Sequence, residues 1–546
     1  MSADDIREKS RKQRLFYNGT FYPLTAPCEP SKEAMLVEGN RIAALGSKEE
    51  IFSLAQKEAE KIDLRGGCVL PGFNDSHCHL LHTAITEEKL DVSSASSPEE
   101  MVRMGREYIE REQIPEGKWV HIIGFDQNRF PEPVLPDGAL ADAISQRHPV
   151  LLERICGHVG AANPLALELA GITPESCIPG GCADVGADGK LTGILRENAL
   201  GAVSACIPRH TAEEIRILLK NASRKAASLG ITSLQSDDLG FVSLKTLFAV
   251  CDELERNGKL SVRIWEEAQA PHRKELEELL SLGYRTGDGG LFKLGNIKLF
   301  TDGSLGARTA FMREPYEGTN DRGIAVYRQD ELDSLVSAAH QNGMQIAFHA
   351  IGDGALEQCV SAVEKAQEQF PRKLRHRIVH CQFAGDDLLS RMKKAGLCAD
   401  IQPPFVPSDA PLVQPLLGET REKTGYRWKT MLHMGIPLGG GSDSPVETMA
   451  PLWGIRCAVT RKTAEGFPPK GWHPEENLSV YEAVSLYTKG GAYLSLEEAE
   501  KGTLEPGKLA DFVVLGKDIF HTDPERIHEI PIQMTVMDGI IRFQAE

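Results

Sequence analysis

The sequence predicts an α/β fold: a (β/α)8 TIM barrel, a small β-sandwich domain built from both chain termini, and an insertion after barrel strand 1. Three observations support this prediction. Short strand-like runs occupy both ends of the 546-residue chain, eight strand-like runs alternate with helical stretches in its middle, and one long segment follows no regular alternation. A chain of this length can bury enough surface for more than one domain.

Both ends of the chain show the pattern of short β-strands. Residues 15–22 and 35–46 are strand-like and contain the hairpin-type dipeptides Asn-Gly and Gly-Asn. Residues 510–515 and 536–543 form similar apolar runs near the C-terminus. Because chain termini often lie close together, we expect the two ends to build one small sandwich.

The middle of the chain alternates strand-like and helical runs, which is typical of a parallel sheet or barrel. The first strand ends at His79, and the others are expected at residues 231–235, 260–266, 296–300, 345–349, 377–380, 397–401 and 436–443. Eight strands is the number that closes a TIM barrel. The predicted domains are residues 1–68 and 496–546 for the sandwich and 69–495 for the barrel, with an insertion at about 81–228.

Composition excludes several classes of partner. The net charge is −17, which argues against nucleic acid or an anionic membrane surface and leaves a small-molecule substrate. The twelve cysteines are scattered without a Cys-x-x-Cys pair, the first 14 residues are polar, and no run of 18 apolar residues occurs. We therefore expect a cytoplasmic protein. Two-fold homodimers are the commonest assemblies, so a homodimer is the expected oligomer.

The first barrel strand ends in a His-x-His pair. Residues two apart on a strand point to the same side, so His77 and His79 can direct both imidazoles at one ion while Cys78 points away. Imidazole is a good ligand for zinc, iron and nickel. The alternative is a pair of solvated or hydrogen-bonded histidines in a loop.

Further polar residues interrupt later strands, mostly where those strands end. His349, His380 and Asp443 end the fifth, sixth and eighth strands, and Lys298 lies inside the fourth between apolar neighbours. In a barrel, catalytic groups occupy the C-terminal ends of the strands. Taken singly, each has a structural alternative: a core histidine with one hydrogen bond, a helix N-cap, or a lysine whose amine reaches solvent. If these residues form no site, all of these structural alternatives would have to apply at once, on separate strands of one barrel.

Together these residues predict a metal site of four histidines, one aspartate and one modified lysine. An uncharged amine on Lys298 can take up carbon dioxide to form a carbamate, an anionic ligand that can bridge two ions. Two divalent ions, about 3.5–4 Å apart, would share a hydroxide and clamp a polar bond. Zinc suits such ligands and lowers the pKa of bound water to about 7. Asp443 would take the proton of that water and pass it to the leaving group.

The motifs that surround these residues resemble those of the amidohydrolase superfamily of metal-dependent hydrolases, over nearly the whole chain. Within the superfamily, the branch that contains N-substituted formamide deformylase is the most similar. The motifs that carry this resemblance lie at residues 70–80, 188–195, 297–310, 348–353, 377–382 and 441–446. The resemblance implies a (β/α)8 barrel with a β-sandwich from both termini. It also implies hydrolysis of a non-peptide C–N bond in a small amide.

The resemblance also implies an arrangement of ligands. One ion would be held by His77, His79 and Asp443, the other by His349 and His380, with carboxylated Lys298 between them. Some relatives work with one ion, so one or two divalent ions are expected.

For substrate contacts we expect His158, Asp302 and Arg308. His158 has a structural alternative, and Asp302 has one as the cap of a turn. Arg308 could bind a substrate carboxylate through two hydrogen bonds. It could also pair with Asp302, which we favour.

Two other functions compete with an amide hydrolase. One is a one-metal deaminase of a heterocycle, which would leave Lys298 without a role. Such deaminases usually carry a glutamate near the histidine of strand five, where this chain has Ala350-Ile351-Gly352. The other is a non-catalytic regulatory protein on the same scaffold. Loss of a ligand would favour it, but all six candidate ligands are present.

Overall fold

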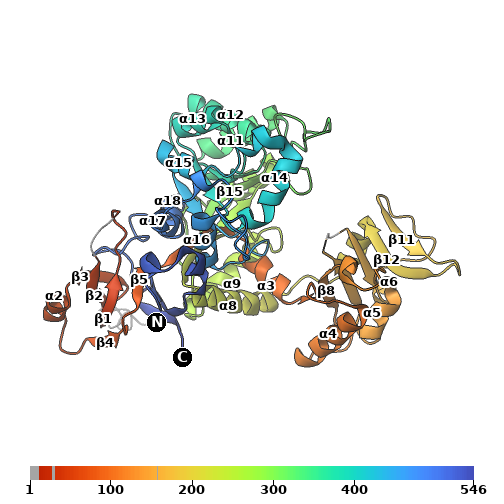
Figure 1. The fold of residues 1–546 in the computed structure, drawn as a ribbon, viewed down its shortest axis with the longest axis horizontal. Coiled ribbons are helices and arrows are strands. Elements are labelled where there is room, and N and C mark those ends of the chain that lie inside the picture. Colours follow the sequence, from red (N-terminus) through yellow and green to blue (C-terminus); the bar gives the residue numbers. More distant parts are fainter. Residues whose placement is uncertain (1–11, 28–30, 156–157) are drawn as a thin grey trace. The chain divides into compact units, whose positions relative to one another are not determined.

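A computed structural model describes residues 12–27, 31–155 and 158–546 of the chain, which is drawn in Figure 1. The chain divides into two compact units, Ala84–Glu214 and the remainder. Most of the polar N-terminal segment, residues 1–11, lies outside the described residues. No helix of the described ranges is long and apolar enough to cross a membrane. The ten cysteines in these ranges are all free thiols.

The barrel sheet has eight strands, and each pairs in parallel with the next one along the sheet. In chain order these strands are β6 (Phe73–Cys78), β13 (Ile231–Ser236), β14 (Arg263–Gln269), β15 (Phe292–Phe300), β16 (Ile346–Ala350), β17 (Arg377–His380), β18 (Cys398–Ile401) and β19 (Leu438–Gly440). Parallel neighbours need crossover connections, and helices supply most of them. They include α9 (Leu244–Arg256), α10 (Arg273–Ser281), α11 (Gln329–Gln341), α12 (Asp353–Gln369), α13 (Asp386–Ala395), α14 (Phe405–Glu422) and α15 (Trp428–Met434). The predicted fold class is confirmed.

Three strands differ from their predicted bounds by three residues or more. The third was expected at 260–266 and runs instead over Arg263–Gln269, because the strand continues through the buried Glu266 and Glu267. The fourth was expected at 296–300 and begins earlier, at Phe292. The eighth was expected at 436–443 and is only Leu438–Gly440. Pro437 has no N–H to donate to a ladder, and the φ of Asp443 is 57°, outside the β region.

The first and last barrel strands meet through loop contacts rather than a regular ladder. The amide of Asp443 donates to the carbonyl of His77 at 2.8 Å, and the amide of His79 donates to the carbonyl of Ser444 at 2.8 Å. The carboxylate of Asp75 accepts from the Oγ of Ser442 at 2.6 Å and from its amide at 3.0 Å. These contacts place the end of the first barrel strand, β6, beside the loop that follows the last one, β19.

Strands from both chain ends share one β-domain, as predicted. Its sheet order is β22-β21-β20-β5-β1-β2-β3, with β4 beside β1. These strands are β1 (Gln13–Phe21), β2 (Lys32–Glu38), β3 (Arg41–Gly46), β4 (Glu60–Asp63), β5 (Cys68–Pro71), β20 (Phe512–Leu515), β21 (Ile532–Met537) and β22 (Ile540–Gln544). C-terminal β20 pairs antiparallel with N-terminal β5, and the rings of Phe16 and Phe512 pack edge to face at 4.9 Å.

The unit Ala84–Glu214 interrupts the barrel after β6 and has its own sheet, in the order β11-β12-β10-β9-β8-β7. The strands are β7 (Leu90–Asp91), β8 (Val120–Phe125), β9 (Val150–Arg154), β10 (Val159–Ala162), β11 (Gly181–Val185) and β12 (Leu191–Glu197). Apolar residues of β8 and β9 pack with Met101 of α4 (Pro98–Arg111) in a separate core. Asn163 caps helix α6 (Pro164–Leu169). The segment therefore folds around its own hydrophobic core.

Candidate metal centre

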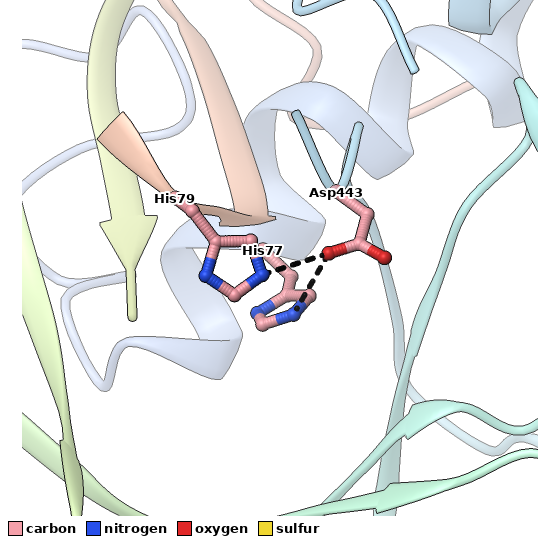
Figure 2. A group of neighbouring side chains, drawn as sticks. All are labelled: His77, His79 and Asp443. Atoms are coloured by element: carbon pink, nitrogen blue, oxygen red, sulfur yellow. Dashed lines mark hydrogen bonds and ion pairs between the residues drawn. The ribbon is translucent and has the colours of Figure 1, made fainter. Parts of the chain in front are cut away.

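The His-x-His pair lies where β6 ends, and both rings meet the carboxylate of Asp443, as Figure 2 shows. The Oδ1 of Asp443 is 3.4 Å from the Nε2 of His77 and 3.1 Å from the Nε2 of His79. One potential ligand atom from each of the three side chains lies within 4.8 Å of the others. The strand alternation predicted from the sequence accounts for this convergence.

The charge state of Asp443 follows from these neighbours. Burial by itself would raise the pKa of the carboxyl, but hydrogen bonds from His77 and His79 hold it well below its usual range. The two imidazoles respond in the opposite sense. Burial opposes their protonation, yet the pKa of His77 is raised to about 9 and that of His79 is also raised. The anionic carboxylate therefore attracts positive charge into the space between the rings, as a proton or as a metal ion.

His349 and His380 form a second group beside the first. The Nε2 of His380 is 2.9 Å from the Nδ1 of His349, and the ring centroids of His380 and His77 are 5.9 Å apart. Burial lowers the pKa of His349 to about 4, with a further contribution from the charge of Lys298. Burial, and then His349, lower the pKa of His380 well below its usual value. Both rings are therefore neutral at pH 7.

Fixed oxygen acceptors determine where these neutral rings carry their protons. The Nε2 of His349 is 3.1 Å from the carbonyl oxygen of Gly303, which can only accept. The Nδ1 of His380 is 2.8 Å from the Oε1 of Gln402, and the amide of Gln402 donates to the carbonyl of Asp400 at 3.2 Å. Both outward nitrogens therefore carry protons. The two nitrogens that face each other across 2.9 Å then carry lone pairs only.

His79 follows the same rule. Its Nδ1 is 2.6 Å from the carbonyl oxygen of Asp237, so this nitrogen carries a proton, and Nε2, which donates to Asp443 when it is protonated, can offer a lone pair to a metal ion that replaces this proton. Metal-ligating histidines usually donate their second ring nitrogen to such an acceptor, which fixes the tautomer. The residues present therefore fit a metal: two neutral imidazoles face each other with lone pairs that only a cation can satisfy, beside an anionic carboxylate.

Lys298 lies inside β15, where the sequence placed it, and its side chain is fully buried. Its Nζ is 3.1 Å from the Nε2 of His77, so it lies beside a candidate ligand atom. The amine also lies 3.5 Å from Glu267 and 3.9 Å from Asp237. These two carboxylates offset the cost of burying an ammonium group.

Buried polar residues that were not predicted from the sequence surround the candidate ligands. Among them, Glu267 lies on β14, Arg377 on β17 and Gln402 after β18, and all three are buried. The signal that identified Lys298, a charged residue inside a strand, also applies to Glu267, whereas Arg377 is the first residue of β17. Gln402 carries no such signal, because an amide at the end of a strand is ordinary.

The carboxylate of Asp302 lies next to the site, but backbone amides already donate hydrogen bonds to both of its oxygens. It accepts from the amides of Phe311, Ile351 and Gly352 at 3.0, 3.1 and 2.8 Å. Burial raises its pKa to about 7 against the effect of these bonds. Its Oδ1 is 3.5 Å from the Nε2 of His349, so it organises the loops on which that histidine rests.

The other two residues expected to contact the substrate lie elsewhere. Arg308 is exposed, and within the described ranges it forms no ion pair with Asp302, which differs from the pairing we favoured. The reason is that backbone amides already hold both oxygens of that carboxylate. His158 belongs to the unit Ala84–Glu214, where its Nδ1 is 2.9 Å from Glu197 and its side chain is exposed. Their predicted contact with a substrate stays a prediction.

Comparison with known proteins agrees with this geometry. A family model described as the amidohydrolase family matches residues 60–543. A putative amidohydrolase, YtcJ of Bacillus subtilis, is 34% identical over 97% of this chain and 99% of its own length. N-substituted formamide deformylase of Arthrobacter pascens is 27% identical over 94% and 95%. The crystal structure of an uncharacterized metal-dependent hydrolase from Pyrococcus furiosus covers 93% of this chain and 100% of its own, with 29% identity and a TM-score of 0.77. The chain therefore belongs to the amidohydrolase family, as its motifs suggested.

Proposed function

We propose that the chain is a metal-dependent hydrolase that cleaves a non-peptide C–N bond, of the amide or formamide type, in a small molecule. The observation that carries the proposal is the pair of facing ring nitrogens of His349 and His380, 2.9 Å apart, whose outward nitrogens both lie against fixed oxygen acceptors, so that the facing nitrogens of the neutral rings carry lone pairs. Two lone pairs at this distance repel each other unless a cation lies between them. The similarity to a formamide deformylase supports the type of bond.

The donor set points to divalent ions, with zinc the best match for imidazole and carboxylate ligands. His77, His79 and Asp443 would hold one ion, and His349 and His380 a second. When bound, such ions supply a water of lowered pKa and polarise the carbonyl to be attacked. The remaining steps fall to the side chains of the chain itself.

Asp443 is the proposed proton carrier. It is ionised at neutral pH because His77 and His79 hold its pKa low. Figure 2 shows its second oxygen pointing away from both imidazoles, so this oxygen is available for a proton. The carboxylate would accept one proton from the attacking water and give it to the leaving nitrogen as the C–N bond breaks. The products are a carboxylic acid and an amine.

Lys298 is the proposed site of a carbamate. The ammonium group would first lose one proton. The uncharged amine and carbon dioxide would then form an N–C bond with release of a second proton, so that a buried cation becomes an anion. Glu267 and Asp237, 3.5 and 3.9 Å from the amine, would then repel the new group unless cations balance the charge. Carbamate formation should therefore depend on bound metal.

A one-metal deaminase is the second candidate, and one observation favours it. The two carboxylates beside Lys298 balance an unmodified ammonium without any need for a bridging ligand. In that case only His77, His79 and Asp443, with one further histidine, would be expected to bind an ion.

Metal content separates these candidates. We would measure divalent metals per chain by elemental analysis in the wild type and in Lys298→Ala, with Lys293→Ala on the same strand as the control. About two ions per chain in the wild type and control, falling in Lys298→Ala, is the result expected for a carbamate-bridged centre. One ion in all three proteins would favour the deaminase. No metal in any of them, even after reconstitution, would overturn both enzyme proposals and favour a regulatory protein.

The substrate class needs an activity test. The metal-loaded protein should release amine from small N-formyl and N-acyl compounds and should not release ammonia from heterocyclic amines. Ammonia release without amine release would overturn the amide hydrolase in favour of the deaminase.

A further inference from the structure

Glu267 is a fully buried carboxylate that none of the proposed steps uses. It lies on β14, and its Oε2 is 3.1 Å from the Nδ1 of His77 and 3.5 Å from the Nζ of Lys298. It therefore contacts two of the six candidate ligands from the side opposite to Asp443. Its other oxygen, Oε1, accepts a hydrogen bond from the Nη2 of Arg377 at 3.0 Å.

Arg377 is held by strands on all sides of the barrel. Its guanidinium donates to Asp400 on β18 at 2.7 Å, to Gln235 on β13 at 2.5 Å, to Asn296 on β15 at 3.0 Å and to the carbonyl of Ser76 on β6 at 2.9 Å. A guanidinium with this many fixed acceptors cannot turn without losing several of them. The orientation of Glu267 is therefore set by the barrel itself.

Of the four histidines, His77 is the one whose outward nitrogen has a carboxylate oxygen as its nearest acceptor, at 3.1 Å; the outward nitrogen of His349 is nearer to a backbone carbonyl, at 3.1 Å, than to Asp302, at 3.5 Å. His79 and His349 use backbone carbonyls, and His380 uses the amide oxygen of Gln402. An anion beside Nδ1 keeps a ring proton on that nitrogen, so that Nε2, which faces Asp443 at 3.4 Å, is the nitrogen that would give up its proton and offer a lone pair to a metal ion.

We propose that Glu267 is a positioning residue of the metal centre, which fixes the tautomer and direction of His77, and that Arg377 holds Glu267 in place. The inference rests on the proposed function, since it needs a metal at His77. Carboxylate partners of metal-ligating histidines raise ligand basicity, and their loss typically weakens metal binding by about 10–100-fold.

Glutamine at position 267 would have one acceptor oxygen where the site needs two. Arg377 requires an acceptor at Oε1, and His77 requires one at Oε2. If the amide oxygen faces Arg377, the NH₂ group faces the Nδ1 of His77. The ring must then accept at Nδ1 and carry its proton on Nε2, where the metal would bind.

The test is zinc affinity of the full-length protein, measured by competition with a chromophoric chelator. Glu267→Gln should bind zinc about 10–100-fold more weakly than the wild type. The matched control is Glu266→Gln, the adjacent residue of β14. Glu266 is equally buried, but its Oε1 accepts from the amide of Asp238 and its side chain faces away from His77. This control should bind zinc as the wild type does.

Two further measurements and one further variant distinguish a folding defect from the loss of a positioning role. Thermal unfolding of the zinc-free proteins shows whether each variant is folded. Glu267→Asp keeps the negative charge for Arg377 but is one methylene shorter, so it should fold and still bind zinc more weakly than the wild type. Replacing zinc with cobalt reports the ligand geometry through the visible absorption spectrum, which should change in Glu267→Gln and not in Glu266→Gln.

The outcomes separate this inference from the function on which it rests. A wild type that binds neither zinc nor cobalt would overturn the proposed function and this inference with it. A wild type that binds zinc, with folded Glu267→Gln or Glu267→Asp binding equally well, would overturn only the role of Glu267. Equal weakening in Glu266→Gln would also overturn it, because any buried carboxylate of β14 would then have the same effect.

Discussion

Two of the candidate ligands have backbone conformations that few residues other than glycine adopt. The φ angles are 57° at Asp443 and 74° at His380, both in the left-handed region. Such conformations cost about 1–3 kcal/mol each and persist only where the surrounding structure enforces them. Here the amide of Asp443 is held by the carbonyl of His77, so the strained residue and its partner come together. This combination is typical of functional sites.

Asp443→Asn tests the proton carrier directly. The amide cannot accept a proton at neutral pH, so kcat for amine release should fall by about 100-fold or more. The control is Glu447→Gln in the same loop, whose carboxylate bonds to Ser408 at 3.0 Å and to none of the ligands. Metal content should be measured on both variants. Activity of Asp443→Asn within a factor of two of the control would contradict the role.

At this scale the candidate ligands carry a local signal in the sequence, and the roles of the residues that support them do not. His77, His79, Lys298, His349, His380 and Asp443 each interrupt or end an apolar run, and strand alternation is enough to place them on one side. The roles of Glu267 and Arg377 depend on contacts between strands that are far apart in the chain. Asp302 shows the same limit, because nothing local indicates that three backbone amides converge on its carboxylate.

Among the elements, β14 and β19 show where periodicity is insufficient. The strand β14 continues through Glu266 and Glu267 because both carboxylates find partners, Glu266 in the amide of Asp238 after β13 and Glu267 in Arg377 of β17. The strand β19 is short because Gly441 lies against the backbone of His77, where a Cβ would come within 2.7 Å of its nitrogen. The glycines that precede Asp443 therefore permit a close approach between the first and last strands.

The segment after helix α18 (Gly491–Leu494) joins the barrel through a buried ion pair network. Glu497 lies 2.8 Å from Lys293 on β15 and 2.6 Å from Lys501. Burial alone would raise the pKa of Glu497, but Lys501 and Lys293 lower it to about 2. A lowered pKa in the folded state stabilises the protein above the ordinary carboxyl pKa, and this contribution is lost as the pH falls toward 2.

Glu497→Gln should therefore lower the free energy of unfolding by about 3 kcal/mol at pH 7. The difference from the wild type should shrink as the pH falls from about 5 toward 2, because the wild-type carboxylate becomes protonated in that range. Thermal unfolding of the wild type and of Glu497→Gln across this pH range measures this difference in stability. Glu500→Gln, an exposed pair with Arg41, should differ by less than about 1 kcal/mol at every pH. A difference in the free energy of unfolding that stays constant across pH would contradict the assignment of this stabilisation to the ionised Glu497 carboxylate.

At the scale of the whole molecule, one arginine connects the barrel with the β-domain. Arg263 at the start of β14 lies 2.7 Å from Asp511, next to β20, and 2.5 Å from Asp538, beyond β21. The side chain of Asp511 is almost fully buried, so it depends on this partner. The β-rich chain ends were evident from sequence, but this pairing was not, because it joins residues separated by 248 and 275 positions.

Arg263→Met should cost about 3–5 kcal/mol of stability, because it leaves two carboxylates beside each other without a cation. Urea unfolding of the full chain measures this loss. The control is Arg256→Met, which removes an exposed helix pair with Asp252 and should cost less than about 1 kcal/mol. Equal effects of the two substitutions would show that the connection between barrel and β-domain adds nothing.

The meeting of the first and last barrel strands has a consequence for synthesis of the protein. His79 and Asp443, which share one contact at 3.1 Å, are 364 residues apart in the chain. At about 5–20 residues per second, a ribosome needs about 20–70 s to translate the interval between them. Throughout that time the nascent chain holds two histidines without the carboxylate that completes their site. Hydrolytic activity should therefore begin only late in translation, when nearly the whole protein exists.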